Sequence, residues 1–496
     1  MPAGSSFGAR ENVFGGFYTQ PTRIHPRTIC ALAFLLVCLA SSSLYGQAVT
    51  GSLLGTVTDI SGATVPGAKV VITEVKTGIS RNTETNASGN YSFPALEPGV
   101  YRVSVERPGF RTAVKEPVDV LVNTTVRADL VLAPGAVTET VTVSAEVPML
   151  QTDRSDTGRK IEMVQIQNMP LPFNRNFQAL LNLVPGTARA WRPHSEFFNP
   201  QDSLSTTVNG SSRLAMNLQF EGVDNNHRTG LLQVLIPPIE ALETVDVSTS
   251  NYEAELGRAG GAVTNIMLRS GTNELHGAVY VFHKDSAMGA RDTFYYAPAY
   301  MPKKPVTTYN YYGFNVGGPI RKNQTFFFGD FLQMKDRRGD GYVITVPTPA
   351  FRNGDFSSQL PRIVIYDPAT GDRNTGAGRT AFPNNQIPDA RISSITKKIL
   401  AMVPPPNMGT GLTNNYTGAT VRSKDNNSFD VKVDHQQTDR DRFSARYSFM
   451  RPVVTDPPRF GMAEGGGKSY TATGVDRTQS AAISYTRLFS PTLISE

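Results

Sequence analysis

Strict alternation of apolar and polar residues along two neighbouring stretches is the feature that most constrains the fold. In SFDVKVDHQ (428–436) the apolar residues are Phe429, Val431 and Val433, and RFSARYSFM (442–450) has the same period. A period of two is typical of a β-strand with one apolar and one polar face. The polar QTDRD between them predicts a turn, and hence an antiparallel hairpin of two strands of roughly nine residues.

Strands of this length approach the ~9 to 11 residues that a tilted strand needs to cross a bilayer. Further candidates are HGAVYVFHK, YNYYGFNVGG, TFFFGDFLQM and TQSAAISYTRLF. Two interpretations of residues 272–496 stay open at this point: the first strands and loops of a transmembrane antiparallel β-barrel, with one face toward lipid and the other toward a wet lumen, or a half-buried sheet of a water-soluble protein. Tyr311, Tyr312, Phe326 and Phe327 are expected to form aromatic girdles at the membrane interface.

The N-terminus resembles an export signal. Basic residues precede the apolar run Ile29–Ala40, and small residues follow it, which is the pattern of a secretory signal peptide. The run is too short for the ~20 apolar residues of a spanning helix. We predict that residues 1–46 are an N-terminal extension and signal peptide. The mature chain then contains no cysteine, because Cys30 and Cys38 both lie in this segment.

Composition and motifs argue against several classes of function. The chain is 39% apolar and 18% charged, with 43 Gly and 34 Pro, which fits many short strands and turns. Its basic residues are scattered, so a nucleic-acid partner is not expected. The histidines lack paired-ligand spacing, and His276 and His283 fall at opposite ends of one predicted strand. No nucleophile elbow or phosphate-binding loop is evident. We predict no enzyme activity, no catalytic residue, no metal and no cofactor.

Residues 47–133 contain short apolar runs separated by Gly and Pro turns, which predict an antiparallel β-sandwich. The order GTVTD, VPGAKVVIT, TNASGNYSFPALEPGVYRVSV and PGF resembles the carboxypeptidase regulatory-like, transthyretin-like domain. That resemblance implies a seven-stranded sandwich related to carbohydrate-binding folds. Two roles stay open for it: a sugar-binding module, or a spacer that docks other parts.

A linker, residues 134–160, follows the sandwich and contains the strand-like TETVTVSAE. Such a peptide can add to the edge of another protein's sheet. By position and type, Thr140, Val141, Thr142 and Val143 resemble the TonB box of TonB-dependent transporters. An ordinary connecting strand would look the same.

Residues 161–271 mix a predicted helix with strands and resemble the plug domain of those transporters. The resemblance rests on MPLPFNRNFQALLNLVPG, VNGSSRLAMNLQFEGVDNN and IEALETVDVSTSNYEAELGRAGGAVTNIMLRSG, in that order. The residues that match plug motifs are Glu221, Gly222, Gly260, Gly261, Val263, Asn265 and Ile266. Glu221 replaces the commoner Asp, a departure that suits the Oar-like branch. The glycines, with Gly257, are expected to let the backbone approach a surrounding wall. The alternative is a soluble α/β domain.

The predicted fold class is therefore mainly β: an N-terminal sandwich, an α+β plug domain and a partial transmembrane barrel. The resemblance implies a receptor and transporter in the Gram-negative outer membrane that takes up an extracellular ligand, possibly carbohydrate or peptide, without covalent chemistry. Its implied partners are TonB with its inner-membrane energising complex and outer-membrane lipid, and the sandwich would be periplasmic. The alternative is a secreted or surface carbohydrate-binding or adhesive β-protein.

Two further expectations concern the last part of the chain. Residues 346–427, rich in Pro, Asn and Gly, are predicted to be mostly an extracellular loop. Only 225 residues follow Gly271, too few for a family barrel of about 22 strands. The sequence is thus expected to be a fragment of a longer protein.

Overall fold

The computed structural model describes most of the chain from Thr50 onward. The described residues are 50–137, 140–143, 157–169, 175–228, 230, 232–252, 256, 259–290, 304–460, 473–490 and 493–496. The predicted signal peptide and Gly257 lie outside them. Strands dominate this part of the chain, so the prediction of a mainly β protein is confirmed. None of its helices is both long and apolar enough to cross a membrane.

Residues 50–133 form the predicted sandwich together with strand β9, which lies in the segment predicted as a linker. One sheet has the order β4-β1-β7, with β8 also beside β1, and the other has the order β3-β2-β5-β6-β9. The strands are β1 (Gly51–Asp59), β2 (Lys69–Glu74), β3 (Ser80–Glu84), β4 (Asn90–Leu96), β5 (Gly99–Glu106), β6 (Thr112–Val120), β7 (Thr125–Arg127), β8 (Leu130–Leu132) and β9 (Thr140–Val143). Alternate residues are buried, as along β1, because the two sheets pack their apolar faces together.

The sandwich differs from its prediction in two ways. It is not wholly antiparallel, since β1 pairs in parallel with both β7 and β8. Strand β3, with the sequence SRNTE, was not predicted because it lies at a sheet edge and has no buried residue. An edge strand can form from polar residues, which leave no apolar period in the sequence.

Residues 157–268 form a second domain, called the central domain below. Its sheet has the order β10-β13-β14-β11-β12. The elements are β10 (Thr157–Glu162), α2 (Met163–Asn168), η2 (Phe177–Leu183), η3 (Arg213–Ala215), β11 (Asn217–Phe220), β12 (Val223–Asp224), η4 (Ile239–Ala241), β13 (Leu242–Ser250) and β14 (Val263–Leu268). Every residue of β14 is buried, as expected for a middle strand that is covered on both faces. Phe177, Leu181, Val245 and Ile266 belong to its core.

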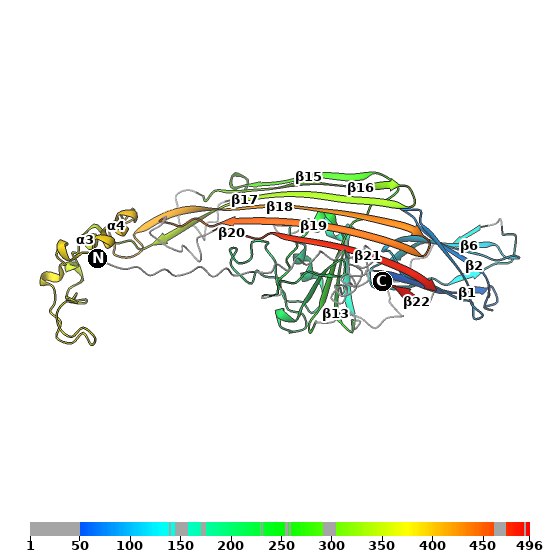
Figure 1. Cartoon of the computed structure of the whole chain (residues 1–496), viewed down its shortest axis with the longest axis horizontal. Coiled ribbons are helices and arrows are strands. Elements are labelled where there is room, and N and C mark those ends of the chain that lie inside the picture. Colours follow the sequence, from blue (N-terminus) through cyan, green and yellow to red (C-terminus); the bar gives the residue numbers. More distant parts are fainter. Residues whose placement is uncertain are drawn as a thin grey trace, which may run out of the picture. The chain divides into compact units, whose positions relative to one another are not determined.

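An eight-stranded antiparallel sheet, called the wall sheet below, follows the central domain (Figure 1). Its order is β15-β16-β17-β18-β19-β21-β22, with β20 beside β19. The strands are β15 (His276–Asp285), β16 (Thr307–Arg321), β17 (Thr325–Ile344), β18 (Tyr416–Thr438), β19 (Asp441–Thr455), β20 (Thr473–Val475), β21 (Thr478–Ser490) and β22 (Leu493–Ser495). The predicted hairpin is β18 and β19, whose strands are longer than predicted, at 23 and 15 residues.

The inner face of the wall sheet carries polar residues, mainly on β18, beside buried aromatic and apolar residues of β16 and β17, and its outer face is apolar. The inner face, which contacts the central domain, carries the buried β18 residues Lys424, Asn426, Ser428, Asp430, Lys432 and Asp434. On the outer face Phe314, Val431 and Tyr447 are 47%, 48% and 38% exposed. A water-soluble sheet would place these two kinds of residue the other way round, whereas a strand in lipid turns its apolar side outward.

The same alternation corrects the predicted girdles. Tyr311 and Phe326 are buried on the inner face, at 3% and 2% exposure, while Tyr312 and Phe327 are half-buried on the other face. Neighbouring residues of a strand point to opposite sides. Two adjacent aromatic residues therefore never belong to one outward girdle, and the prediction is wrong for Tyr311 and Phe326.

The predicted loop of residues 346–427 is shorter than expected, because β18 already begins at Tyr416. The loop is built from compact turns and short helices, including α3 (Pro349–Arg352) and α4 (Ser394–Met402). Arg352 holds it together by donating to the carbonyl oxygens of Leu400 and Val403 at 2.7 and 2.8 Å.

Candidate functional site

Three groups of charged side chains join the central domain to the inner face of the wall sheet, and this interface is the candidate functional site. Each group is centred on a carboxylate of the central domain: Glu221, Asp202 or Glu240. Buried charges are tolerated when they are paired and hydrogen-bonded. These contacts therefore define how the central domain is seated on the sheet.

Glu221 lies in the turn between β11 and β12, where it has a φ of 49° and Gly222 a φ of 75°. Its carboxylate is 2.7 Å from Lys432 Nζ and 3.1 Å from Arg446 Nε. All three side chains are at most 8% exposed. The Arg446 guanidinium also lies 3.9 Å from the centre of the Phe220 ring. One carboxylate thus bridges two cations from adjacent strands of the wall sheet.

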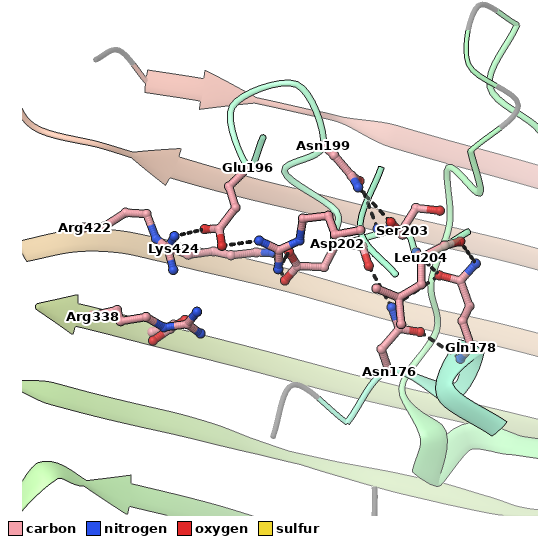
Figure 2. Close-up of polar contacts among 12 residues, drawn as sticks. Asn176, Gln178, Glu196, Asn199, Asp202, Ser203, Leu204, Arg338, Arg422 and Lys424 are labelled. Carbon is pink, nitrogen blue, oxygen red and sulfur yellow. Dashed lines mark hydrogen bonds and ion pairs between the residues drawn. The ribbon is translucent and has the colours of Figure 1, made fainter. Parts of the chain in front are cut away.

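Asp202 is the centre of a second group (Figure 2). Its carboxylate pairs with Lys424 of β18 and lies 2.5 Å from Arg192. Arg192 also pairs with Glu196, which lies 2.7 Å from Arg422 of β18. Burial acts to raise the pKa of Asp202, but Lys424, Arg192 and Arg422 outweigh it and hold the pKa below its usual 3.8. The carboxylate therefore stays charged beneath the central domain.

Hydrogen bonds to the backbone keep the loop that carries Asp202 in place (Figure 2). Asn176 Nδ2 donates to the carbonyl oxygen of Asp202 at 2.7 Å, and Gln178 Oε1 accepts from the N–H of Leu204 at 2.7 Å. Asn176 also caps η2 by accepting from the N–H of Gln178. The position of the charged group is thus set from inside the central domain.

Glu240 forms the third group, at the start of η4. Its carboxylate accepts from Arg175 Nε at 2.9 Å and from the Tyr311 hydroxyl at 3.0 Å. Asn315 Nδ2 donates to the Glu240 carbonyl oxygen at 3.1 Å. The Arg175 guanidinium covers the Phe282 ring, with 3.8 Å to the ring centre. This group contacts β15 and β16, so the three groups together contact four strands of the wall sheet, β15, β16, β18 and β19.

Apolar packing accompanies these polar contacts, and Tyr309, Tyr311, Leu332 and Met334 form a buried apolar cluster on the inner face of β16 and β17. Of the described wall-sheet residues, Phe328 and Met450 belong to the apolar core of the central domain. Polar interfaces between domains exchange their contacts for water more readily than apolar ones and are compatible with relative motion. The arrangement can therefore hold a domain in place and still release it.

The predicted motif residues lie around the central sheet. Val263, Asn265 and Ile266 are on β14, which pairs in parallel with β11. Asn265 Oδ1 accepts from the N–H of Gly222 at 3.2 Å. The motif therefore braces the turn that presents Glu221, although only Glu221 contacts the wall sheet through an ion pair.

The two glycines before β14 serve the central domain itself. Both Gly260 and Gly261 donate their N–H to the carbonyl oxygen of Ala215, at 2.9 and 3.0 Å. A Cβ on Gly261 would lie 2.4 Å from Ser211 Oγ, and one on Gly260 would lie 3.4 Å from Ala215 Cβ. The expected close approach to a surrounding wall is therefore wrong for both positions, because the crowding atoms belong to the same domain.

Thr140, Val141, Thr142 and Val143 form β9, the edge strand of a sandwich sheet. The strand pairs in parallel with β6, in register from Thr112–Thr140 to Lys115–Val143. The sequence correctly indicated a strand here but did not indicate this partner.

Most wall-sheet residues of the interface were missed from the sequence: Lys424, Lys432, Arg446, Arg422, Tyr311 and Asn315. A signal existed, because the polar positions of the SFDVKVDHQ strand carry charges of both signs. Charged side chains that face a water-filled lumen do not need partners of opposite charge. Alternating Asp and Lys on one face therefore indicated a partner domain against that face.

Comparisons with known proteins agree with this architecture. A family model described as an outer membrane beta barrel domain matches residues 267–496, and the carboxypeptidase regulatory-like domain matches residues 52–133. The TonB-dependent transporter Oar of Myxococcus xanthus is 26% identical over 309 residues. The chain is thus similar in sequence to a TonB-dependent transporter. The aligned part covers 60% of this chain and 28% of Oar, so the chain spans under a third of that relative's length.

Two solved structures are also similar to the chain. The outer membrane transporter YddB of Escherichia coli is 9% identical, covers 67% of this chain and 37% of its own, and has a TM-score of 0.41. The siderophore receptor PirA of Acinetobacter baumannii is 13% identical, covers 66% of this chain and 45% of its own, and has a TM-score of 0.32.

The barrel-domain match and the similarity to Oar confirm the predicted location in the Gram-negative outer membrane. The predicted N-terminal sandwich is confirmed as a carboxypeptidase regulatory-like domain. TonB-dependent transporters are not enzymes, which agrees with the expectation that the chain performs no covalent chemistry.

Proposed function

We propose that this chain is part of an outer-membrane TonB-dependent receptor that takes up an extracellular ligand, with the central domain as its plug. The residues Thr140–Val143 are the segment that TonB binds, and the sandwich lies in the periplasm. TonB, driven by its inner-membrane energising complex, would pull this segment and displace the plug from the wall sheet. The ligand itself undergoes no bond making or breaking.

The observation that carries the proposal is the polar seat of the central domain on the inner face of the wall sheet. Glu221, Asp202 and Glu240 contact that face through ion pairs and hydrogen bonds. Such contacts are specific in position, yet water can replace each of them when the domains separate. An immobile structural core would instead be expected to use continuous apolar packing.

The apolar outer face of the wall sheet argues against the alternative of a secreted carbohydrate-binding or adhesive protein. Residues such as Phe314 and Val431 remain about half exposed, and a contiguous apolar face of this kind is unfavourable in water. Lipid solvates it instead.

Movement of the plug can be tested with a cysteine placed beneath it. Ser428 is 3% exposed on the inner face and its hydroxyl has no hydrogen-bond partner among the described residues, so Ser428→Cys is a mild change. Cells expressing the native gene with this substitution are treated with a membrane-impermeant maleimide. The proposal predicts labelling of the cysteine in cells that have both TonB and a proton gradient. Labelling should be at least fivefold lower in cells that lack TonB and in cells whose proton gradient is dissipated.

The matched control is Ser358→Cys, an exposed residue of the loop between β17 and β18. Its labelling is expected to be the same in all cells. Equal labelling of Ser428→Cys with and without TonB would contradict the proposed function.

A further inference from the structure

The edge of strand β6 is an occupied docking surface. β6 is flanked by β5 on one side and by β9 on the other, and β9 pairs with it over four residues, Thr112–Lys115 against Thr140–Val143. Beyond these four residues β6 continues into Glu116 and Pro117, and proline offers no N–H for further pairing.

The segment that leads into β9 follows the same edge. Arg111 donates its N–H to the carbonyl oxygen of Ala133 at 2.8 Å, and Gly135 donates to the carbonyl oxygen of Gly109 at 3.2 Å. The Thr112 hydroxyl then donates to the carbonyl oxygen of Val137 at 2.7 Å. Residues 133–137 thus make contacts next to the pairing of β9, which is not an isolated strand contact.

A strand that is paired on one side has already used half of its backbone hydrogen-bonding groups. In this chain, β6 of the sandwich pairs with the backbone groups on one side of Thr140–Val143, the segment that we assign to TonB binding. We propose that the β6 edge of the sandwich holds residues Thr140–Val143 in a docked state, and that TonB competes with β6 for this strand. The inference rests on the proposed function, because it assigns the same segment as the TonB-binding site.

The docked state has a physical consequence for regulation. If TonB takes the backbone groups of β9 that β6 uses, β9 must first leave β6, and the apparent affinity for TonB is then scaled down to the fraction of molecules in which β9 is undocked. Any event that loosens the β6 edge would raise that affinity, and anything that binds the docked sandwich would lower it. The sandwich would thereby control whether TonB can bind the chain, in addition to any binding role of its own.

A disulfide across the docked pair tests the proposal. Val114 and Thr142 are register partners, and paired strands lie about 4.8 Å apart, within the range that a disulfide spans. The double variant Val114→Cys/Thr142→Cys is made in the full chain with Cys30 and Cys38 changed to serine. It is purified in detergent, and binding of the purified periplasmic domain of TonB is measured before and after oxidation.

The control is Val114→Cys/Thr140→Cys. Its two positions are offset by two residues, which separates the Cα atoms by about 8 Å, too far for a disulfide. We expect a disulfide in the first variant and none in the control. Oxidation should weaken TonB binding at least tenfold in the first variant only, and reductant should restore it.

Three results would overturn parts of the proposal in distinguishable ways. Absence of the disulfide, or equal cross-linking in both variants, would contradict docking. A cross-linked protein that binds TonB as tightly as the reduced one would contradict competition. If the reduced protein and the unmodified chain both fail to bind TonB, the assignment of Thr140–Val143 to TonB is wrong, whatever the cross-linking shows.

A milder substitution gives an independent measurement. Thr112→Val keeps the shape of the side chain and removes the hydrogen bond to the Val137 carbonyl. If β9 is docked, TonB affinity should rise about two- to tenfold, because one net hydrogen bond of the docked state is lost. An unchanged or weaker affinity for TonB would contradict the proposal that β6 and TonB compete for β9.

Discussion

Glu221 has a left-handed backbone, with a φ of 49°, which costs an ordinary L-residue about 1–2 kcal/mol relative to the right-handed region. The conformation aims its carboxylate at Lys432 and Arg446, both almost fully buried. Without Glu221, two cations of the wall sheet would lose their principal partner. A glycine at this position would relieve the backbone but supply no charge.

Substituting Glu221→Gln tests this role. The variant leaves Lys432 and Arg446 buried without the carboxylate that both of them contact, which is expected to cost about 3–5 kcal/mol. The measurement is the midpoint of denaturant unfolding of the purified chain in detergent. Asp129→Asn, which breaks the exposed pair with Arg127, is the control and should cost about 1 kcal/mol or less. An equal loss of stability for the two substitutions would contradict a stabilising role for the ion pairs of Glu221.

Asp202 makes a prediction about pH. Its pKa is lowered below 3.8 in the folded chain, so the folded state binds fewer protons than the unfolded state and stability rises with pH in that range. The stabilisation should be complete above about pH 4–5 and decline as the pH falls through the folded pKa. We expect the difference in thermal midpoint between the unmodified chain and Asp202→Asn to be constant from pH 7 to 5 and to shrink below 4. A difference that stays constant down to pH 3 would be inconsistent with this role.

At the scale of elements, Gly271 joins the central domain to the wall sheet. A Cβ at this position would lie 2.3 Å from the carbonyl oxygen of Phe327 and 2.5 Å from that of Gly318. Both atoms belong to strand backbone, which cannot rotate away as a side chain can. The absence of a side chain is what lets the connection pass against β16 and β17.

Gly271→Ala is therefore expected to destabilise the chain by about 1–3 kcal/mol or more through overpacking. Gly289→Ala is the matched control, because a Cβ there meets nothing within 4 Å and the φ of −105° suits alanine. Thermal unfolding of both variants in detergent provides the comparison. A loss at Gly271 no greater than at Gly289 would show that the connection is not close-packed.

The elements that could be predicted from the sequence are those whose apolar period is complete. The β18 and β19 hairpin and most sandwich strands were found because their buried faces alternate strictly. β3 was missed because it buries nothing, and the full length of β18 was missed because its first residues lack that alternation. The register partners of β9 and the ion pairs of Glu221 depend on residues far away in the sequence, and no local pattern encodes them.

At the scale of the whole molecule, the order of the parts determines how a pull would act. The proposed TonB segment precedes the central domain, whose first strand, β10, lies at an edge of its sheet and, among the strands that the structure describes, pairs with β13 alone. A force on Thr140–Val143 therefore reaches β10 first. An edge strand can separate from its sheet while the core around β14 remains intact. The proposed plug can therefore open from one side before its ion pairs with the wall sheet break.

The central claim is that TonB binds the backbone of Thr140–Val143. It is tested most directly by calorimetric titration of the purified full chain in detergent with the periplasmic domain of TonB. We predict saturable binding. Val141→Pro should abolish it, because proline removes a backbone donor and disfavours strand pairing. Val141→Thr should change the dissociation constant by no more than about twofold, since threonine retains both the backbone donor and β-branching. Absence of binding by the unmodified chain, or binding that Val141→Pro leaves unchanged, would contradict the account.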